Sequence, residues 1–113
     1  MPDTTTTLAT LKHAVRQFAA ERHWEPYHSP KNLSMGLAVE AAELMEHFLW
    51  LETAASRAVT GDPVKLGEIA DEMADVANYL LNLSNVLGID LSDAILAKIA
   101  KNAVKYPAPQ DKG

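Results

Sequence analysis

Two stretches of this sequence repeat one acidic pattern within apolar, helix-periodic surroundings. The first pair is Glu40 and Glu43, the second is Glu72 and Asp75, and a ring-bearing residue follows four positions after each pair. Spacings of three and four residues place these side chains on one stripe of an α-helix, whereas a strand would send the paired acids to opposite faces. The pattern therefore predicts two helices, each with a line of acids along it.

Large apolar residues lie beside both acidic stripes. On a helical wheel Leu44 lies on one side of the first stripe, and Val39 and Trp50 lie on the other. Ile69 and Val76 lie beside the second stripe. If the apolar faces pack together, the carboxylates meet at the edge of the core, where they repel one another and lose hydration. A single acidic pair is otherwise typical of a solvated helix face, and that alternative stays open.

A divalent cation would neutralise such a cluster, since few lysines stand near it. Carboxylate oxygens in a chain without cysteine favour magnesium, with manganese as a substitute. The lack of cysteine also excludes disulfides, thiolate catalysis and zinc–thiolate sites. The net charge of −5 and the absence of a basic tract argue against a nucleic-acid polymer as partner. A nucleotide substrate stays compatible, because metal ions reverse the sign of an acidic pocket.

The remaining signals predict an all-α chain. Ser29 before Pro30 and the acidic Asp90 are typical helix starts, and Gly88 is a typical helix end. Hydroxyl groups in the run Thr4–Thr7 offer a cap for the first helix. The predicted helices span about residues 8–23, 31–58, 64–87 and 91–105.

The chain is expected to form a single domain, 1–113, with loose tails at 1–6 and 108–113. A domain of this length buries a modest core, so oligomerisation is expected to complete it. No apolar run is long enough to span a bilayer, and no signal-peptide pattern opens the chain. We therefore expect no membrane partner and a cytoplasmic location.

The fourth predicted helix offers cations for a phosphate site. Lys98, Asn102 and Lys105 share one stripe, while Ile95 and Ile99 point to the core on the adjoining side. A phosphate site needs such cations as well as a metal. The alternative is that the lysines only complement the dipole at the carboxyl end of the helix.

Aromatic residues gather around the loop that precedes the second predicted helix. Trp24, His28 and Asn32 lie in or beside this loop, and Trp50 follows later. The rings could enclose a nucleobase, while His28 or Asn32 hydrogen-bonds its edge. Ordinary packing at a helix–loop corner is the alternative.

Together these motifs resemble the all-α NTP pyrophosphohydrolases, the MazG-like superfamily, and most closely its dCTP pyrophosphatase branch. The resemblance covers about residues 8–107, nearly the whole chain. It is carried by Glu40-x-x-Glu43, by Glu72-x-x-Asp75, by the segments 24–32 and 43–50, and by the final stretch 98–107.

The resemblance implies a fold, a reaction and a set of site residues. The fold is a four-helix-bundle-like core assembled as a dimer or tetramer, with active sites near subunit contacts. The reaction is magnesium-dependent hydrolysis of a nucleoside triphosphate to the monophosphate and pyrophosphate. The expected substrate is dCTP or a modified pyrimidine deoxynucleotide, removed in a house-cleaning role. The implied residues are Glu40, Glu43, Glu72 and Asp75 for the metal, Lys98, Asn102, Lys105 and Tyr106 for phosphates, and Trp24, His28 and Trp50 for the base. Our own expectation adds Glu43 and Glu72 for catalysis and Asn32 for substrate binding.

Two departures from the resembled pattern leave the preferred base open. Lys105 stands where relatives often carry arginine, and Tyr27 stands where phenylalanine is common. Two rival functions also stay open. One is a pyrophosphohydrolase for another substrate, such as phosphoribosyl-ATP, against which the aromatic loop speaks. The other is a helical oligomerisation module without catalysis, whose melting temperature magnesium would not raise.

Overall fold

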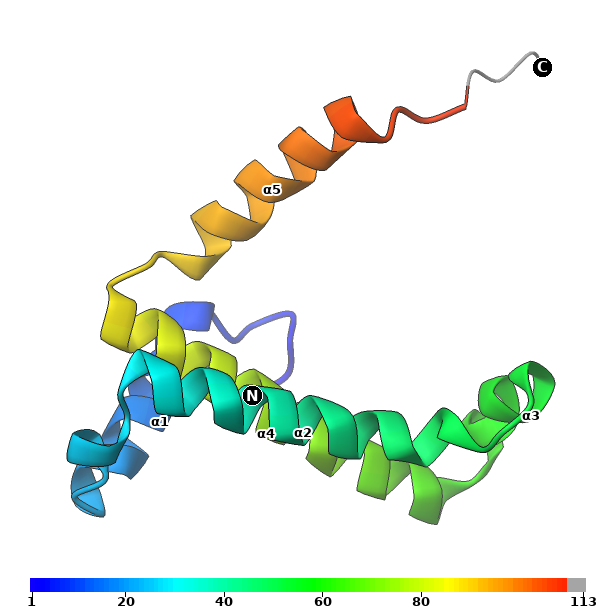
Figure 1. Ribbon diagram of the computed structural model, residues 1–113, viewed down its shortest axis with the longest axis horizontal. Helices are drawn as coiled ribbons and strands as arrows, with labels where there is room; N and C mark the ends of the chain where they lie inside the picture. Colours follow the sequence, from blue (N-terminus) through cyan, green and yellow to red (C-terminus); the bar gives the residue numbers. More distant parts are fainter. Residues whose placement is uncertain (110–113) are drawn as a thin grey trace.

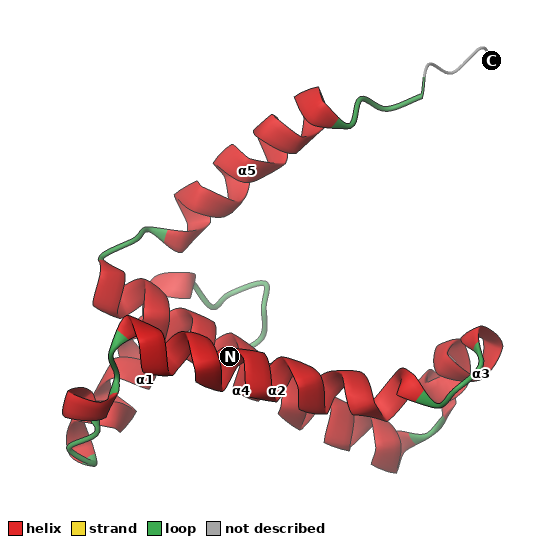
Figure 2. Ribbon diagram, viewed as in Figure 1, coloured by secondary structure: helices red, strands yellow, loops and turns green. Residues whose placement is uncertain are grey.

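A computed structural model describes residues 1–109, and those residues contain helices and no strand (Figure 2). The predicted all-α fold is therefore confirmed. The elements in chain order are α1 (Leu8–Glu21), the 3₁₀ helix η1 (Glu25–Tyr27), α2 (Pro30–Leu49), α3 (Thr53–Arg57), the 3₁₀ helix η2 (Ala58–Gly61), α4 (Pro63–Leu87) and α5 (Leu91–Lys105).

The centre of the molecule is the pair α2 and α4, which lie side by side, with α1 packed on α4 (Figure 1). Gly36 on α2 allows the ring of Tyr79 on α4 to approach closely, because a Cβ there would lie 2.7 Å from the Tyr79 Cζ atom. The buried apolar side chains of the described residues are few: Ala19, Leu33, Ile69 and Leu81. This core is small for the length of the chain, as the sequence predicts.

Side-chain caps start the main helices where the sequence predicts them. The Ser29 hydroxyl accepts a hydrogen bond from the Asn32 amide at 3.1 Å, and Pro30 occupies the first turn of α2. A carboxylate oxygen of Asp90 accepts from the Asp93 amide at 2.9 Å and starts α5. At the other end of α4, Gly88 adopts a left-handed conformation with φ of 65°. These local signals therefore set the helix boundaries.

The prediction of one helix over residues 31–58 is wrong. Helix α2 ends at Leu49, the Leu51 amide bonds back to the Phe48 carbonyl at 3.0 Å, and Glu52 is extended. The apolar periodicity continues through this break, so periodicity alone gives no sign of it. The short helices α3 and η2 instead reverse the chain so that α4 can begin at Pro63 and run back along α2 (Figure 1).

Helix α5 does not join the core of the single chain. The break at residues 88–90 bends the chain by 102° between α4 and α5, and α5 projects away from the other helices (Figure 1). The radius of gyration is 17.3 Å, against roughly 13 Å for a compact chain of this length. The prediction that Ile95 and Ile99 point to the core is wrong here, since they are 45% and 58% exposed.

Residues 1–6, predicted to be a loose tail, form a turn in which the amides of Thr5 and Thr6 donate to the Pro2 carbonyl at 3.1 and 3.0 Å. Of the other predicted tail, residues 110–113 lie outside the described part of the chain. Within residues 1–109 no single helix is long and apolar enough to cross a membrane. Only α4 and α5 taken together, as a bent pair, meet that length and composition.

Candidate functional site

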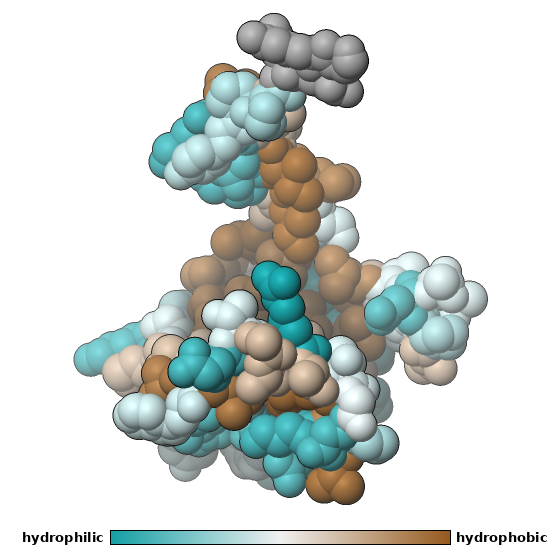
Figure 3. Space-filling view, turned by 90° about the vertical axis from the view of Figure 1, so that its right-hand side faces the viewer, coloured by the Kyte–Doolittle hydropathy of each residue, from teal (hydrophilic) through white to brown (hydrophobic). Residues whose placement is uncertain are grey.

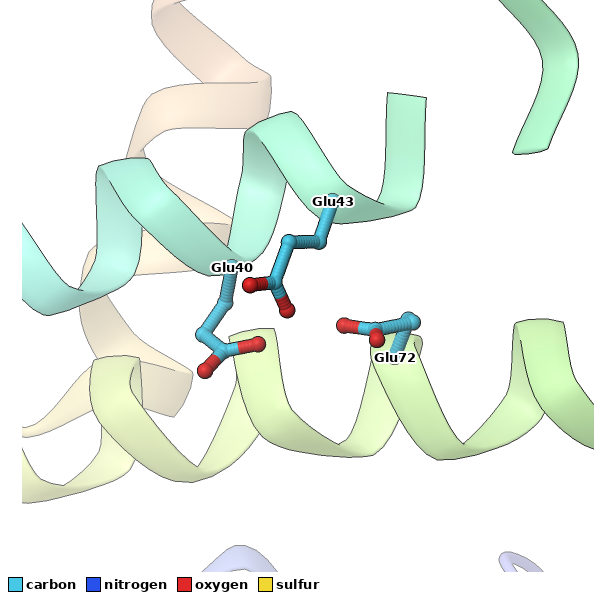
Figure 4. A group of neighbouring side chains, drawn as sticks. All are labelled: Glu40, Glu43 and Glu72. Carbon is cyan, nitrogen blue, oxygen red and sulfur yellow. The ribbon is translucent and has the colours of Figure 1, made fainter. Parts of the chain in front are cut away.

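Three carboxylates converge between α2 and α4, and we call them the acidic cluster: Glu40, Glu43 and Glu72. One oxygen from each lies within 4.8 Å of the other two. Figure 4 shows Glu40 and Glu43 extending from one helix and Glu72 from the other, with their carboxylates turned toward one another. Glu40 and Glu72 are half-buried, and Glu43 is exposed. The two acidic helices of the sequence therefore meet through these side chains.

The oxygens of the acidic cluster lack donors within residues 1–109. The Oε2 atoms of Glu40 and Glu72 are both buried and have no hydrogen-bond partner. The described ion pairs join Arg22 to Glu21 and Lys65 to Glu68, so none of them reaches the cluster. Buried carboxylate oxygens are normally paired with a donor or a metal.

The close approach of these carboxylates also affects the pKa of Glu40, which rises from 4.5 to about 7. Burial is the largest cause, because it penalises the charged form. A hydrogen bond with Glu43, which Glu40 can donate only when protonated, and the charge of Glu43 raise it further. A hydrogen bond with Glu72 and the charge of Asp75 complete the causes. The raised pKa means that Glu40 holds a proton for part of the time near neutral pH when no cation is present.

These properties fit a hard divalent cation. Oxygen donors from two helices lie close enough together to share one ion, and no lysine or arginine among the described residues competes for them. Magnesium and manganese favour such oxygen ligands and retain sites for water or phosphate. An ion would also supply the partner that Glu40 and Glu72 lack.

A pocket of about 540 Å³, which we call the main pocket, adjoins the acidic cluster. Glu40 and Asp75 supply its acidic end. Asp75 is exposed and lies outside the group of three converging carboxylates, although its charge acts on Glu40. The other residues that line the pocket come from α1, the loop after it and α4: Ala14, Val15, Phe18, Ala19, Trp24, His28, Asn78, Tyr79 and Asn82.

The backbone at the end of α1 turns Trp24 toward the main pocket. His23 adopts φ of 56°, a left-handed conformation, and the Trp24 amide bonds back to the Ala19 carbonyl at 3.0 Å. The Trp24 ring then meets the Phe18 ring edge-on, with centroids 5.6 Å apart, and lies 6.2 Å from the His28 ring. Aromatic packing of this kind makes a rigid wall.

Asn32 takes part in holding the loop before α2. Its Nδ2 atom donates to the Tyr27 carbonyl at 3.0 Å. Asn32 also lines a second cavity of about 330 Å³ with Trp24, His28 and Tyr79, and these last three line the main pocket as well. The two cavities therefore share their aromatic walls.

Comparison with known proteins decides the family of this chain. The family profile described as MazG-like matches residues 36–113. The chain belongs to the MazG-like family. The resemblance that the sequence motifs indicated is thereby confirmed.

This MazG-like chain is similar to proteins of known name. It is 34% identical over 107 residues to dCTP pyrophosphatase 1 of Rattus norvegicus, covering 95% of this chain and 63% of that protein. It is 35% identical over 102 residues to dCTP pyrophosphatase 1 of Homo sapiens, covering 90% and 60% respectively. The chain thus spans less than two thirds of the length of these relatives.

A solved structure matches almost completely. The crystal structure of a pyrophosphatase from Archaeoglobus fulgidus DSM 4304 has a TM-score of 0.81 and 34% identity. The match covers 96% of this chain and 99% of that one. The arrangement of helices in this MazG-like chain, including the reversal through α3, is therefore one that a natural pyrophosphatase also adopts.

The single MazG-like chain leaves some predicted site residues away from the acidic cluster. Trp50 follows α2 at its far end and is 88% exposed. Its neighbour on the wheel, Val39, is 56% exposed, so apolar cover on that side of the first stripe is missing. Helix α5 and its end carry the predicted phosphate ligands, none of which lines the main pocket: Lys98, Asn102, Lys105 and Tyr106.

The main pocket also contains residues to which the sequence reasoning assigned no role. Tyr79, the ring that follows the second acidic pair, lines both cavities. Asn78 and Asn82 also line the main pocket, and two asparagines four residues apart in an apolar helix are a usable sequence signal. Phe18 lines it from α1 and is 48% exposed.

Proposed function

We propose that this chain hydrolyses nucleoside triphosphates to the monophosphate and pyrophosphate with the help of magnesium. The observation that carries the proposal is the acidic cluster, where one oxygen from each of three carboxylates lies within 4.8 Å of the others, and where the Oε2 atoms of Glu40 and Glu72 are buried without partners among the described residues. The pocket beside it is large and apolar enough to receive a nucleoside. The family and the named relatives support the same reaction class.

The substrate we propose is dCTP or a modified pyrimidine deoxynucleotide, removed as part of nucleotide house-cleaning. The names of the mammalian relatives support a cytosine base. The rings of Phe18, Trp24 and Tyr79 line the pocket and suit a flat base. We expect this activity in the cytoplasm.

In the proposed reaction a water oxygen bonds to the α-phosphorus. The bond from that phosphorus to the bridging oxygen of the β-phosphate breaks, and pyrophosphate leaves with the electron pair. We assign the water proton to Glu43, which is the exposed member of the acidic cluster and is therefore accessible to a water molecule. Glu72 completes the cluster from the opposite helix, where it would hold the metal that binds the reacting phosphate.

Glu40, Glu43, Glu72 and Asp75 are the residues that would hold the metal. A magnesium ion bound there would neutralise charge on the phosphates and make a bound water more acidic. Trp24 and His28 then hold the base, and Asn32 supports them by fixing the loop through the Tyr27 carbonyl.

The phosphate ligands of α5 are proposed to act across a contact between two copies of the chain, in a dimer or tetramer. Helix α5 carries an apolar strip that no other part of residues 1–109 covers, and Figure 3 shows it in brown, continuing onto the bundle below. Ile95, Leu96 and Ile99 in this strip are between 45% and 65% exposed. A second copy that covers the strip would bring its own phosphate ligands to the substrate bound by the first copy. The phosphate ligands are Lys98, Asn102, Lys105 and Tyr106. We propose that Trp50, which is exposed in the single chain, joins the base pocket in the same assembly.

The proposed reaction is tested by following products from a panel of deoxynucleoside triphosphates in oxygen-18 water. We expect pyrophosphate and a monophosphate that carries the label, because attack at the α-phosphorus leaves the new oxygen there. Label in pyrophosphate would place the attack at the β-phosphorus, and release of orthophosphate would contradict the scheme. Chelation of the metal should stop turnover.

A non-catalytic oligomerisation module is the main rival, and metal binding separates it from the proposal. Magnesium that binds only the native state raises the melting temperature, and the stabilisation grows with the logarithm of its concentration once that concentration exceeds the dissociation constant. A melting temperature that magnesium leaves unchanged, together with no product, would favour the module. Hydrolysis of phosphoribosyl-ATP in preference to every deoxynucleotide would favour the other rival.

A further inference from the structure

Three asparagines lie along one stripe of α4, at spacings of four and three residues: Asn78, Asn82 and Asn85. Asparagine is a weak helix former, because its side chain competes for backbone hydrogen bonds. The stripe therefore brings no advantage to the helix itself. All three side chains face the region between α4 and α1, since they line cavities there or bond to α1.

Asn85 has a structural role that accounts for its whole carboxamide. Its Nδ2 atom donates to the Lys12 carbonyl at 2.9 Å, and its Oδ1 atom accepts from an Arg16 guanidinium nitrogen at 3.0 Å. Lys12 in turn donates to the Ile89 carbonyl at 2.8 Å. Asn85 thus joins α1 to the carboxyl end of α4.

Asn78 and Asn82 have no comparable partner. Within residues 1–109 neither carboxamide hydrogen-bonds with another side chain or with the backbone, and both line the main pocket. Asn82 is half-buried, and it also borders a smaller cavity of about 180 Å³ that contains Arg16. A carboxamide offers two donors and an acceptor, and such groups are rarely left without a partner where water has limited access.

The position of Asn82 matches the far end of a bound nucleotide. It lies seven residues after Asp75 on α4, which corresponds to roughly 10 Å along the helix axis. This is comparable to the span from an α-phosphate through the sugar to the outer edge of a base. The aromatic rings of Trp24 and Tyr79 line the pocket together with both residues.

We propose that Asn82, assisted by Asn78, hydrogen-bonds the edge of the nucleobase and determines which bases this site accepts. The inference rests on the proposed function, because it places the phosphates at the acidic end of the pocket. The carboxamide oxygen accepts from an exocyclic amino group, and the carboxamide nitrogen donates to the adjacent ring nitrogen, as cytosine presents them. The nitrogen of Asn32 already bonds the Tyr27 carbonyl, so Asn82 is the better placed amide for this role.

The test measures equilibrium binding of dCMP and of the monophosphate of 2-pyrimidinone deoxyriboside, which lacks the exocyclic amino group. We expect the wild-type protein with magnesium to bind dCMP about three- to tenfold more tightly, the value of one neutral hydrogen bond. Asn82→Leu should remove this preference, because dCMP loses its bonds to the amino group and the ring nitrogen, whereas the analogue loses only the bond to the ring nitrogen. Asn82→Asp keeps the acceptor for the amino group and loses the donor to the ring nitrogen that both nucleotides carry, so it should weaken both and retain the preference. Asn78→Leu should cause a smaller loss of preference.

Asn85→Ala is the matched control, because it alters an asparagine of the same stripe outside the main pocket. It should lower the melting temperature and leave the preference between the two nucleotides unchanged. The inference is overturned if Asn82→Leu retains the wild-type preference, if Asn82→Asp binds both ligands as tightly as wild type does, or if wild type does not prefer dCMP. Binding needs no turnover, so absence of hydrolysis would reject the proposed function without deciding the role of Asn82.

Discussion

The pair α2–α4 and the helix α5 carry the two chemical halves of the proposed site, and they differ in how they are placed. The acidic half is assembled within one chain, since carboxylates from both helices of the pair converge (Figure 4). The basic half on α5 projects away from the chain that carries it (Figure 1).

The apolar residues of the two regions differ in the same way. Leu33 and Ile69 of the helix pair are at most 5% exposed, whereas Ile99 on α5 is 58% exposed. Burial of an apolar side chain stabilises by about 1.5–3 kcal/mol, so a helix that buries none contributes little to the stability of the single chain. The comparison teaches that packing within one chain assembles the acidic half, whereas the basic half that we propose for phosphate binding makes no such contact in the single chain.

The largest expected effect is on the acidic half. Glu72→Gln should lower kcat/KM by about a hundredfold or more, since even residues behind metal ligands change activity by 10- to 100-fold. The magnesium-induced rise in melting temperature should also disappear. Glu46→Gln is the control, because Glu46 is an exposed acid on α2 outside the cluster. Full activity of Glu72→Gln would reject the ligand assignment.

A charge on the apolar strip of α5 should have the next largest effect. Ile99→Glu should leave the helical content of the chain unchanged and convert the assembly to a 12.3 kDa species in light scattering. Activity should fall by about tenfold or more, because a charge buried in an interface costs several kcal/mol. Ala97→Glu places the same charge on the opposite face of α5 and should change neither the mass in light scattering nor the activity. An Ile99→Glu protein with unaltered mass and activity would contradict the proposed role of the α5 strip in a contact between two copies of the chain.

A methyl group added between α2 and α4 should lower the stability of the helix pair that carries the acidic half. Gly36→Ala places its Cβ against the Tyr79 ring, and overpacking of this kind costs about 1–3 kcal/mol. The melting temperature should fall by roughly 5–12 °C. Gly67→Ala is the matched helical control, because a Cβ there meets no atom within 4 Å and should raise stability slightly. Equal effects of the two variants would contradict the close contact.

The smallest expected effect is a pH dependence that originates in Glu40. Its pKa is raised from 4.5 to about 7, so the folded state keeps a proton that the unfolded state releases. The metal-free protein should therefore lose stability as pH rises from about 4.5 to 7. Over the same range magnesium should bind more tightly, since it competes with that proton. Thermal melts with and without magnesium from pH 5 to 8.5 measure both trends. Glu40→Gln should flatten the pH dependence of the melting temperature of the metal-free protein.

Local signals were sufficient to predict most helix boundaries and the acidic cluster. The caps at Ser29 and Asp90 and the left-handed Gly88 depend on a few neighbouring residues, so they can be read directly. The spacing of Glu40, Glu43 and Glu72 within apolar helices predicted acids at a helix–helix margin, and three of the four predicted carboxylates converge there.

Other features depended on long-range contacts and could not be predicted. The end of α2 before Trp50 follows from the need to reverse the chain, although the apolar pattern continues through it. The turn that directs Trp24 uses a left-handed histidine, His23, where glycine would have been the recognisable signal. The sequence therefore identifies the aromatic residues but does not predict that they line one wall of the pocket.

The sequence by itself determined that the chain is helical, where most of its helices begin, and which face of α2 and of α4 carries the acids, because a helix repeats every 3.6 residues whatever surrounds it. Only the tertiary structure decided that α2 and α4 bring those acids together, that Tyr79 packs over Gly36, and that α5 leaves the bundle. The physical reason is that these outcomes depend on which apolar surfaces find a partner, and periodicity along one segment carries no information about the surface that will cover it.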